Sequence, residues 1–117
     1  MSSFYINASS FTSYNITKLT HYIINKPGIY TLTENIILGD LTYDTCDSIL
    51  DFDSYCAIQI NSSNVILDLN NFSISTTDNY IIKRNFFKLI DCKHHHTITI
   101  KNGSLYNTSG YCIYAND

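Results

Sequence analysis

The chain has 117 residues and a formal net charge of −3 at pH 7, and its Lys and Arg residues are scattered. This length suits one domain with a modest core, and the lack of a basic cluster argues against nucleic acid as a main partner. Ala occurs only at Ala8, Ala57 and Ala115, whereas Ile, Tyr, Asn, Ser and Thr are abundant. Because this composition favours strands and turns over long helices, we expect an all-β fold.

Nothing in the sequence indicates export or membrane insertion. No apolar run approaches the roughly 20 residues that a membrane-spanning helix needs. The first residues lack the basic and apolar regions of a signal peptide. We therefore expect no membrane span and an intracellular or virion-associated location. The Ile-, Asn- and Tyr-rich composition is typical of an AT-rich genome, such as that of a large DNA virus or of some protists.

Residues 1–20 are mostly polar with scattered apolar side chains, which is typical of a segment that covers the end of a repeat stack. We expect 1–20 to form an N-terminal cap and 21–117 to form the main domain. Short strands are predicted at 21–24, 29–32 and 35–38. Between the first two, Pro27 and Gly28 suit the central positions of a type II turn, because Gly accepts a positive φ there.

Residues 40–56 interrupt this rhythm, and we interpret them as an insertion loop. Asp47, Asp51 and Asp53 could ligate Ca²⁺, but the spacing is not that of an EF-hand. A solvated acidic loop is the simpler interpretation, and we expect no bound metal here.

One pattern occurs twice, at 65–74 and 96–105, separated by 31 positions. This alignment places Leu67 on Ile98, Leu69 on Ile100 and Asn71 on Asn102. Alternating apolar residues, a polar turn and one more apolar residue describe one turn of a solenoid. Further strands are predicted at 57–60, 65–69, 73–75, 87–89, 98–100, 104–106 and 111–115.

A resemblance to a known family rests on three of these stretches. Residues 26–36 resemble the entry coil of right-handed parallel β-helix proteins, the pectin-lyase-like superfamily, and 64–71 and 97–103 resemble later coils. The resemblance implies a short right-handed parallel β-helix of three to four coils. It implies a fold and not an activity, because the superfamily includes lyases, glycosidases, tailspikes and adhesins as well as proteins without known activity.

Stacking of successive coils would give several residues a structural role. We expect an inner apolar column and an Asn ladder at one corner, with glycines at the turns. The residues concerned are Leu67, Leu69, Ile98, Ile100, Asn71, Asn102, Gly28 and Gly103.

Cysteine and histidine residues provide weak candidates for a metal site. Cys92, His94 and His96 are close in sequence, but side chains that alternate along a strand cannot all face one ion. Stacking could also bring Cys92 and Cys112 within disulfide range, and Cys46 and Cys56 flank one loop. Without an export signal we expect free thiols and no cofactor.

No pattern of catalytic residues emerges from the sequence. Asp68 and Lys101 would lie near each other on successive coils, where an exposed ion pair is the simplest interpretation. Asp91 is predicted at a corner. Tyr106, Tyr111 and Tyr114 could form a binding patch for a glycan or a protein. We expect no enzyme, because a chain of this length leaves no room for the long groove that holds a polymer.

The sequence therefore favours a non-catalytic structural or interaction module. We expect self-association through coil ends or faces, because an end coil exposes unpaired backbone groups and an apolar face. The alternatives are a carbohydrate-binding or carbohydrate-degrading remnant of the same fold, and the N-terminal part of a longer fibre or surface protein.

Overall fold

The computed structural model describes residues 2–11, 20–38, 56–76, 88–93, 95–106 and 112–115. Within these ranges the regular structure is short strands and one 3₁₀-helix, and no helix there is long and apolar enough to cross a membrane. The elements are β1 (Ser3–Ile6), η1 (Ala8–Ser10), β2 (Thr20–Ile24), β3 (Gly28–Leu32), β4 (Ile36–Leu38), β5 (Cys56–Ile60), β6 (Val65–Asp68), β7 (Ser73–Thr76), β8 (Lys88–Lys93), β9 (Ile98–Lys101), β10 (Ser104–Tyr106) and β11 (Ile113–Ala115).

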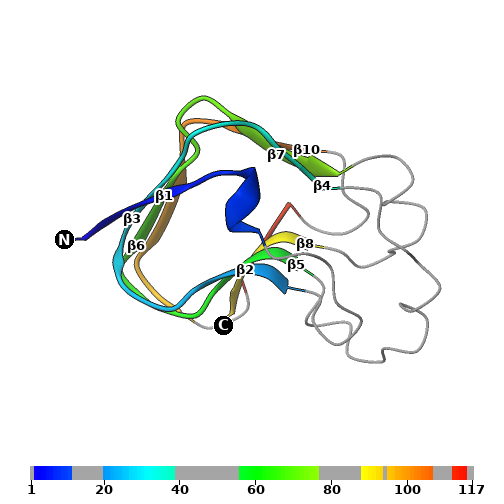
Figure 1. The fold of residues 1–117 in the computed structure, drawn as a ribbon. Coiled ribbons are helices and arrows are strands. Elements are labelled where there is room, and N and C mark those ends of the chain that lie inside the picture. The colour runs from blue at the N-terminus through cyan, green and yellow to red at the C-terminus, as the bar shows by residue number, and fades with distance from the viewer. Residues whose placement is uncertain are drawn as a thin grey trace.

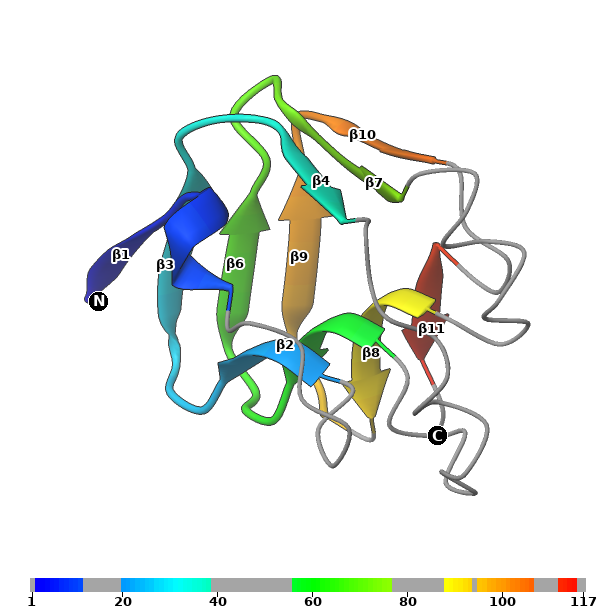
Figure 2. The same cartoon turned by 45° about the vertical axis from the view of Figure 1, so that its right-hand side comes forward.

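The strands form three sheets, and every pairing is parallel. The sheet orders are β1-β3-β6-β9, β4-β7-β10 and β2-β5-β8-β11. Along the chain, β2, β3 and β4 enter the three sheets in turn, and β5–β7 and β8–β10 repeat that order. Figures 1 and 2 show the strands of each sheet side by side around a common interior. The expectation of an all-β fold is confirmed.

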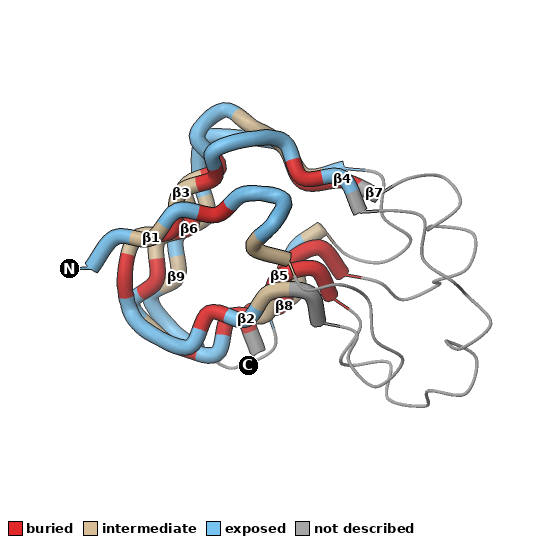
Figure 3. Tube along the Cα trace, in the orientation of Figure 1, coloured by how far each residue is buried: buried red, intermediate tan, exposed pale blue. Residues whose placement is uncertain are grey.

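The core follows from alternation within the strands. In β3 and β6 every second residue is buried, because successive side chains of a strand point to opposite faces. Figure 3 shows the buried positions recurring at matching places in stacked strands. The large side chains that are fully buried are Ile6, Ile24, Leu32, Ile36, Ile58, Ile60, Leu67, Leu69 and Ile74.

The register of the repeat differs from the predicted one. Val65 pairs with Ile98 and Leu67 with Ile100, a shift of two residues from the predicted alignment. Ile74 nevertheless pairs with Leu105, which is the separation of 31 positions in the predicted alignment. The inward-facing set is unchanged, because a shift of two residues preserves the face to which each side chain points.

The corner after β6 accounts for this difference. Four residues separate β6 from β7, but only Asn102 and Gly103 separate β9 from β10. Leu69 uses the additional length to turn inward, and it is 2% exposed. A Cβ at Gly103 would collide with the Leu69 side chain and lie 2.5 Å from the Phe72 carbonyl oxygen. Gly103 is therefore structural because it leaves space for Leu69.

Asn residues at the corners adopt the left-handed conformation, as expected. Asn71 has φ of 66° and Asn102 has φ of 62°. The Asn71 backbone N–H donates to the Asn102 carbonyl. The Asn102 side-chain amide instead donates to Asp68 Oδ1 over 3.2 Å, so the contact within the Asn pair runs through the backbone.

Gly28 begins β3 and does not lie inside a type II turn, which corrects the prediction for that residue. Its φ of +156° is far from the value near +80° of a type II turn. A Cβ there would lie 2.8 Å from the Ser2 carbonyl oxygen. The close approach of the N-terminal strand thus explains the glycine.

β8 extends through Lys93, so Asp91 and Cys92 belong to a strand and not to the predicted corner. Asp91 is 1% exposed, and its Oδ2 lies 3.7 Å from Lys88 Nζ. A buried carboxylate is tolerated when a cation pairs with it. The charged Asp91 side chain led to the prediction of an exposed corner. The ion pair with Lys88 instead allows Asp91 to be buried within a strand.

The N-terminal end of the stack is covered. β1 extends the first sheet beyond β3, and Ile6 is fully buried. Ala8 N–H donates to Glu34 Oε2 over 2.8 Å, and the Phe11 ring lies 5.7 Å from that of Tyr22. Residues 2–11 thus lie where the predicted cap was expected. Residues 12–19 of the predicted cap and 40–55 of the predicted loop are outside the described residues, and Cys56 belongs to β5.

Candidate functional site: the open end of the stack

The opposite end of the stack is formed by β9, β10 and β11, which are terminal in their three sheets. No described strand pairs with the outer edge of any of them. Outer edges of terminal strands carry backbone N–H and C=O groups that can pair with another chain. This end, which we call the open end, is therefore the first candidate for a functional surface.

Side chains at the open end belong to the inner columns but are incompletely covered. Val65, Leu67 and Ile74 are fully buried, whereas their register partners Ile98, Ile100 and Leu105 are only half-buried. On β11, Ile113 is 45% exposed, although its partner Ile90 on β8 is fully buried. The same inner positions thus lose their covering at the last turn.

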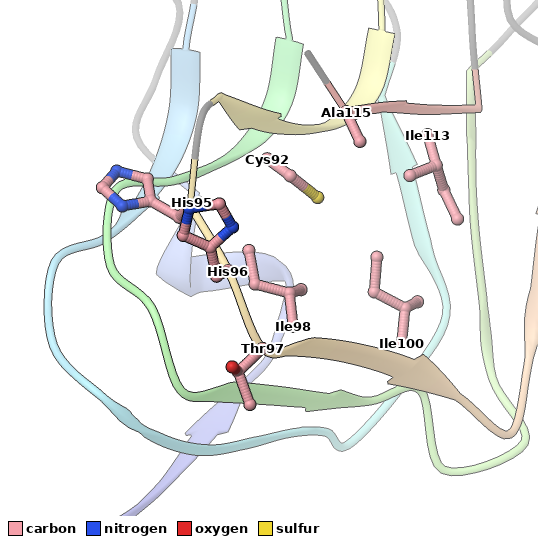
Figure 4. Close-up of a pocket in the computed structure, with 8 residues that line it drawn as sticks. All are labelled: Cys92, His95, His96, Thr97, Ile98, Ile100, Ile113 and Ala115. Carbon is pink, nitrogen blue, oxygen red and sulfur yellow. The ribbon is translucent and has the colours of Figure 1, made fainter. Parts of the chain in front are cut away.

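A shallow pocket of about 470 Å³ lies at this end. Its volume is within the range of small-molecule pockets, but it is wide open. Figure 4 shows the Cys92 sulfur pointing among the apolar side chains and the His95 ring turned away from them. The lining residues are Cys92, His95, His96, Thr97, Ile98, Ile100, Ile113 and Ala115.

The chemistry of this pocket does not favour a metal ion. Burial, with a smaller contribution from Asp91, raises the pKa of the Cys92 thiol to about 11, so the thiolate that binds metals is disfavoured. Among the described residues no group of three or more His, Cys, Asp or Glu could hold a metal. His96 lines the pocket with Cys92, and His94 lies outside the described residues.

Cys92 and Cys112 are free thiols, as expected. Ile90 N–H donates to the Cys112 carbonyl, so Cys112 stacks near Leu89 and not over Cys92. The Cys112 thiol donates to the Leu105 carbonyl oxygen at 3.4 Å. This hydrogen bond connects β10 to the residue that precedes β11.

The tyrosines of the predicted binding patch lie on different sheets. Tyr106 on β10 is 52% exposed, while Tyr114 on β11 is half-buried with Lys88 Nζ 4.9 Å from its ring centroid. Tyr111 lies outside the described residues. The structure therefore does not unite the two described tyrosines on one sheet face, and the patch stays a prediction.

Asp68 and Lys101 are register partners on β6 and β9, as the sequence suggested. Asp68 Oδ1 accepts hydrogen bonds from the Asn70 N–H at 2.9 Å and the Asn102 amide at 3.2 Å. The two charged groups make no ion pair with each other in the described structure. Asp68 thus organises two corners and shows no catalytic arrangement.

No family model matches the chain, and no curated protein or solved structure is similar enough to count as a match. The function is therefore argued from geometry.

The sequence did not indicate that Ile113 and Ala115 share a pocket with Ile98 and Ile100 at the open end. They are about 15 positions away along the chain, and only stacking of the sheets brings them to one pocket. The apolar residues of the last predicted strand, 111–115, were a signal for such a site, because terminal strands expose inner positions. The site could be recognised only once the terminal strands of the three sheets were known.

Proposed function

We propose that this chain is a short right-handed parallel β-helix that serves as a non-catalytic structural module and self-associates through its open end. The observation that carries the proposal is the contrast between Leu67, fully buried, and its partner Ile100 on the last turn, half-buried.

The β-helix part of the proposal is supported by the sheet topology. Three passages through the same three sheets, with parallel pairing throughout, are the connectivity of a coil. Crossover connections between parallel strands of one sheet are right-handed in about 98% of cases. The right hand is therefore the expected one.

The self-association part is supported by the asymmetry of the two ends. Residues 2–11 cover one end with exposed polar residues such as Asn7 and Ser9, whereas the other end presents Ile98, Ile100 and Ile113. Burying apolar area contributes roughly 25 cal/mol per Å², so covering such an end is favourable. Covering the end with another protein surface would also satisfy the free strand edges.

The test is the molar mass of the chain by light scattering across a concentration series. We expect a mass above that of the 13.4 kDa chain, falling to it on dilution. Ile113→Asp places a charge on the open end and should shift the association to much higher concentration.

The matched control is Ile37→Asp. Ile37 is 64% exposed on β4, the first strand of its sheet, so the same substitution there should leave association unchanged. A single-chain mass for the parent at every concentration would overturn the proposal. If Ile113→Asp and Ile37→Asp changed the association equally, the interface would not lie at the open end.

A further inference from the structure

We propose that two copies of the chain form a closed two-fold dimer in which β11 of each copy pairs, antiparallel, with the outer edge of β9 of the other. This inference rests on the proposed function and specifies its partner as a second copy. The strand pair is formed twice, because the two-fold axis relates its two halves.

The order of the strands gives the open end a step. β8, β9 and β10 make the third passage through the three sheets, and β11 begins a fourth passage beyond β8. β11 therefore projects one strand further along the stack than β9 and β10. No described strand continues the sheet of β9 to the level of β11. A partner that supplies one strand at that level fits the step.

A second copy supplies this strand without overlap. The two-fold axis that sets β11 of one copy beside β9 of the other exchanges the places of the sheets that end in β9 and β11. Each projecting β11 then occupies the level that the β9 sheet of the other copy lacks. The third sheet ends at β10 in both copies, so the two β10 strands lie on opposite sides of the contact. The two steps interlock, and an isologous contact of this kind closes on itself.

The backbone of β9 has the polarity that this pairing needs. The Thr97 and Lys101 carbonyls accept hydrogen bonds from the β6 side, at 3.2 and 2.8 Å. Backbone groups alternate in direction along a strand. The N–H and C=O groups of Ile98 and Ile100 therefore point to the outer edge of β9, where they can pair with another chain.

The backbone of β11 has the matching polarity. The Cys112 carbonyl accepts a hydrogen bond from the Ile90 N–H on β8, at 3.0 Å. By the same alternation, the backbone groups of Ile113 and Ala115 point away from β8. Both strands thus direct the backbone groups of two inner residues to the edge that meets the other copy.

The inner side chains agree with this backbone pairing. Ile113 exchanges both hydrogen bonds with Ile100 of the other copy, and Ala115 does the same with Ile98. Figure 4 shows these four side chains, from β11 and β9, pointing into one pocket. In the dimer Ile113 and Ala115 of the other copy fill that pocket and lie beside Ile98 and Ile100. The contact thereby covers Ile113, which is 45% exposed in the single chain.

Charge does not oppose the contact. Lys101 is the only Lys, Arg, Asp or Glu among the described residues of β9, β10 and β11, and it lies beyond the three paired residues of β9. The middle pair is Thr99 with Tyr114 of the other copy, and both side chains are neutral at pH 7. Lys88, which lies over the Tyr114 ring, is paired with Asp91.

The first experiment is amide hydrogen exchange of the parent chain, above and below the concentration at which it associates. The backbone N–H groups of Ile98, Ile100, Ile113 and Ala115 should exchange more slowly in the associated form, because they become hydrogen-bonded. The N–H groups of β1, at the covered end, serve as the control and should exchange at the same rate in both forms.

The second experiment is disulfide trapping with a variant that carries Thr99→Cys and Tyr114→Cys. Opposed residues in a non-hydrogen-bonded antiparallel pair have Cα atoms about 4.5 Å apart, within disulfide range. We expect covalent dimer as the main product of mild oxidation, with residue 99 of one chain linked to residue 114 of the other by mass spectrometry.

The matched control for trapping combines Thr99→Cys with Tyr106→Cys. Tyr106 is 52% exposed on β10, which does not pair with β9 of the other copy in the proposed dimer. This variant should therefore show only the background cross-linking of the parent chain, which has four cysteines.

The two experiments distinguish the pairing from the proposed function. A parent that stays single-chain at all concentrations overturns the proposed function. Association with neither slower exchange in β9 and β11 nor a 99–114 link overturns the strand pairing and leaves the proposed function standing. Slower exchange without that link overturns the register, and a 99–114 link within assemblies larger than two chains overturns the closed two-fold.

Discussion

At the scale of single residues, corners between strands depend on backbone conformations that few residue types tolerate. Asn64, Asn71 and Asn102 have positive φ near 60°, which Asn adopts at low cost. Thr97 occupies the same conformation with φ of 60°, although its side chain is β-branched. Because Asn64 N–H donates to the His96 carbonyl and Val65 N–H to that of Thr97, the two corners are stacked.

Thr97→Asn should therefore stabilise the fold. A left-handed conformation costs roughly 1–2 kcal/mol for an ordinary side chain, and Asn removes part of this, so we expect a gain of about 1 kcal/mol in unfolding free energy. Urea denaturation measures the gain. The opposite substitution at the stacked corner, Asn64→Thr, should cost a similar amount. An unchanged urea midpoint for both variants would show that the backbone of Thr97 is not strained.

Gly103→Ala should destabilise the fold because the new Cβ meets Leu69 and the Phe72 carbonyl oxygen. Overpacking of this kind costs about 1–3 kcal/mol. The neighbouring Ser104→Ala, at an exposed residue, should stay within about 0.5 kcal/mol. Equal midpoints for the two variants in urea would refute the close approach of Leu69 to Gly103.

Buried titratable groups predict a loss of stability at alkaline pH. Burial and, less strongly, Asp91 raise the pKa of Cys92 to about 11, and burial also raises the pKa values of Tyr22 and Tyr30. A raised pKa means that the folded state resists deprotonation, so stability holds below about pH 9 and declines as the pH rises to about 11.

Thermal melts between pH 8 and 11 test this prediction. The parent melting temperature should fall over that range, and Cys92→Ala should reduce the fall while leaving the tyrosine contribution. An identical pH profile for parent and variant would show that Cys92 is not the group responsible.

At the scale of elements, β6 is an inner strand of its sheet. It lies between β3 and β9, and Leu67 pairs with Tyr30 on one side and Ile100 on the other. Ile66 points to the opposite face and is half-buried. The two faces of one strand should thus contribute differently to stability.

Leu67→Ala should cost about 2–5 kcal/mol of unfolding free energy, because it removes a fully buried side chain from the core. Ile66→Ala in the same strand should cost clearly less. Urea denaturation of both variants measures the difference, and comparable losses would mean that the inward and outward faces have been assigned wrongly.

At the scale of the whole molecule, one covered end and one open end give the stack a direction. The N-terminal segment contributes Ile6 to the core and stacks Phe4 on Tyr30, with ring centroids 4.7 Å apart. The segment therefore protects β3 from pairing with another chain.

Deleting residues 1–11 should expose a second apolar end and permit head-to-tail stacking. We expect light scattering to show larger assemblies for the deletion variant than for the full chain. Tyr5→Ser, at a β1 residue that is 72% exposed, should keep the parent mass. A deletion variant that keeps the parent mass would show that the cap does not limit assembly.

The sequence by itself determined most of the strands, although not β1, and which of their side chains face inward. Residues 65–69 were predicted as a strand and form β6 with the expected alternation, because alternation depends only on neighbouring residues. The predicted strand at 87–89 was displaced, since the buried Lys88–Asp91 pair does not look apolar in sequence.

Only the tertiary structure decided the register and the surfaces. The two additional residues of the corner after β6 move Leu67 onto Ile100, and the sequence alone does not distinguish this from the 31-residue alignment, because both keep the same inward face. Which strands are terminal, and therefore which Ile residues remain exposed, depends on how whole turns stack. Local patterns do not record that stacking, because it involves residues that are far apart along the chain.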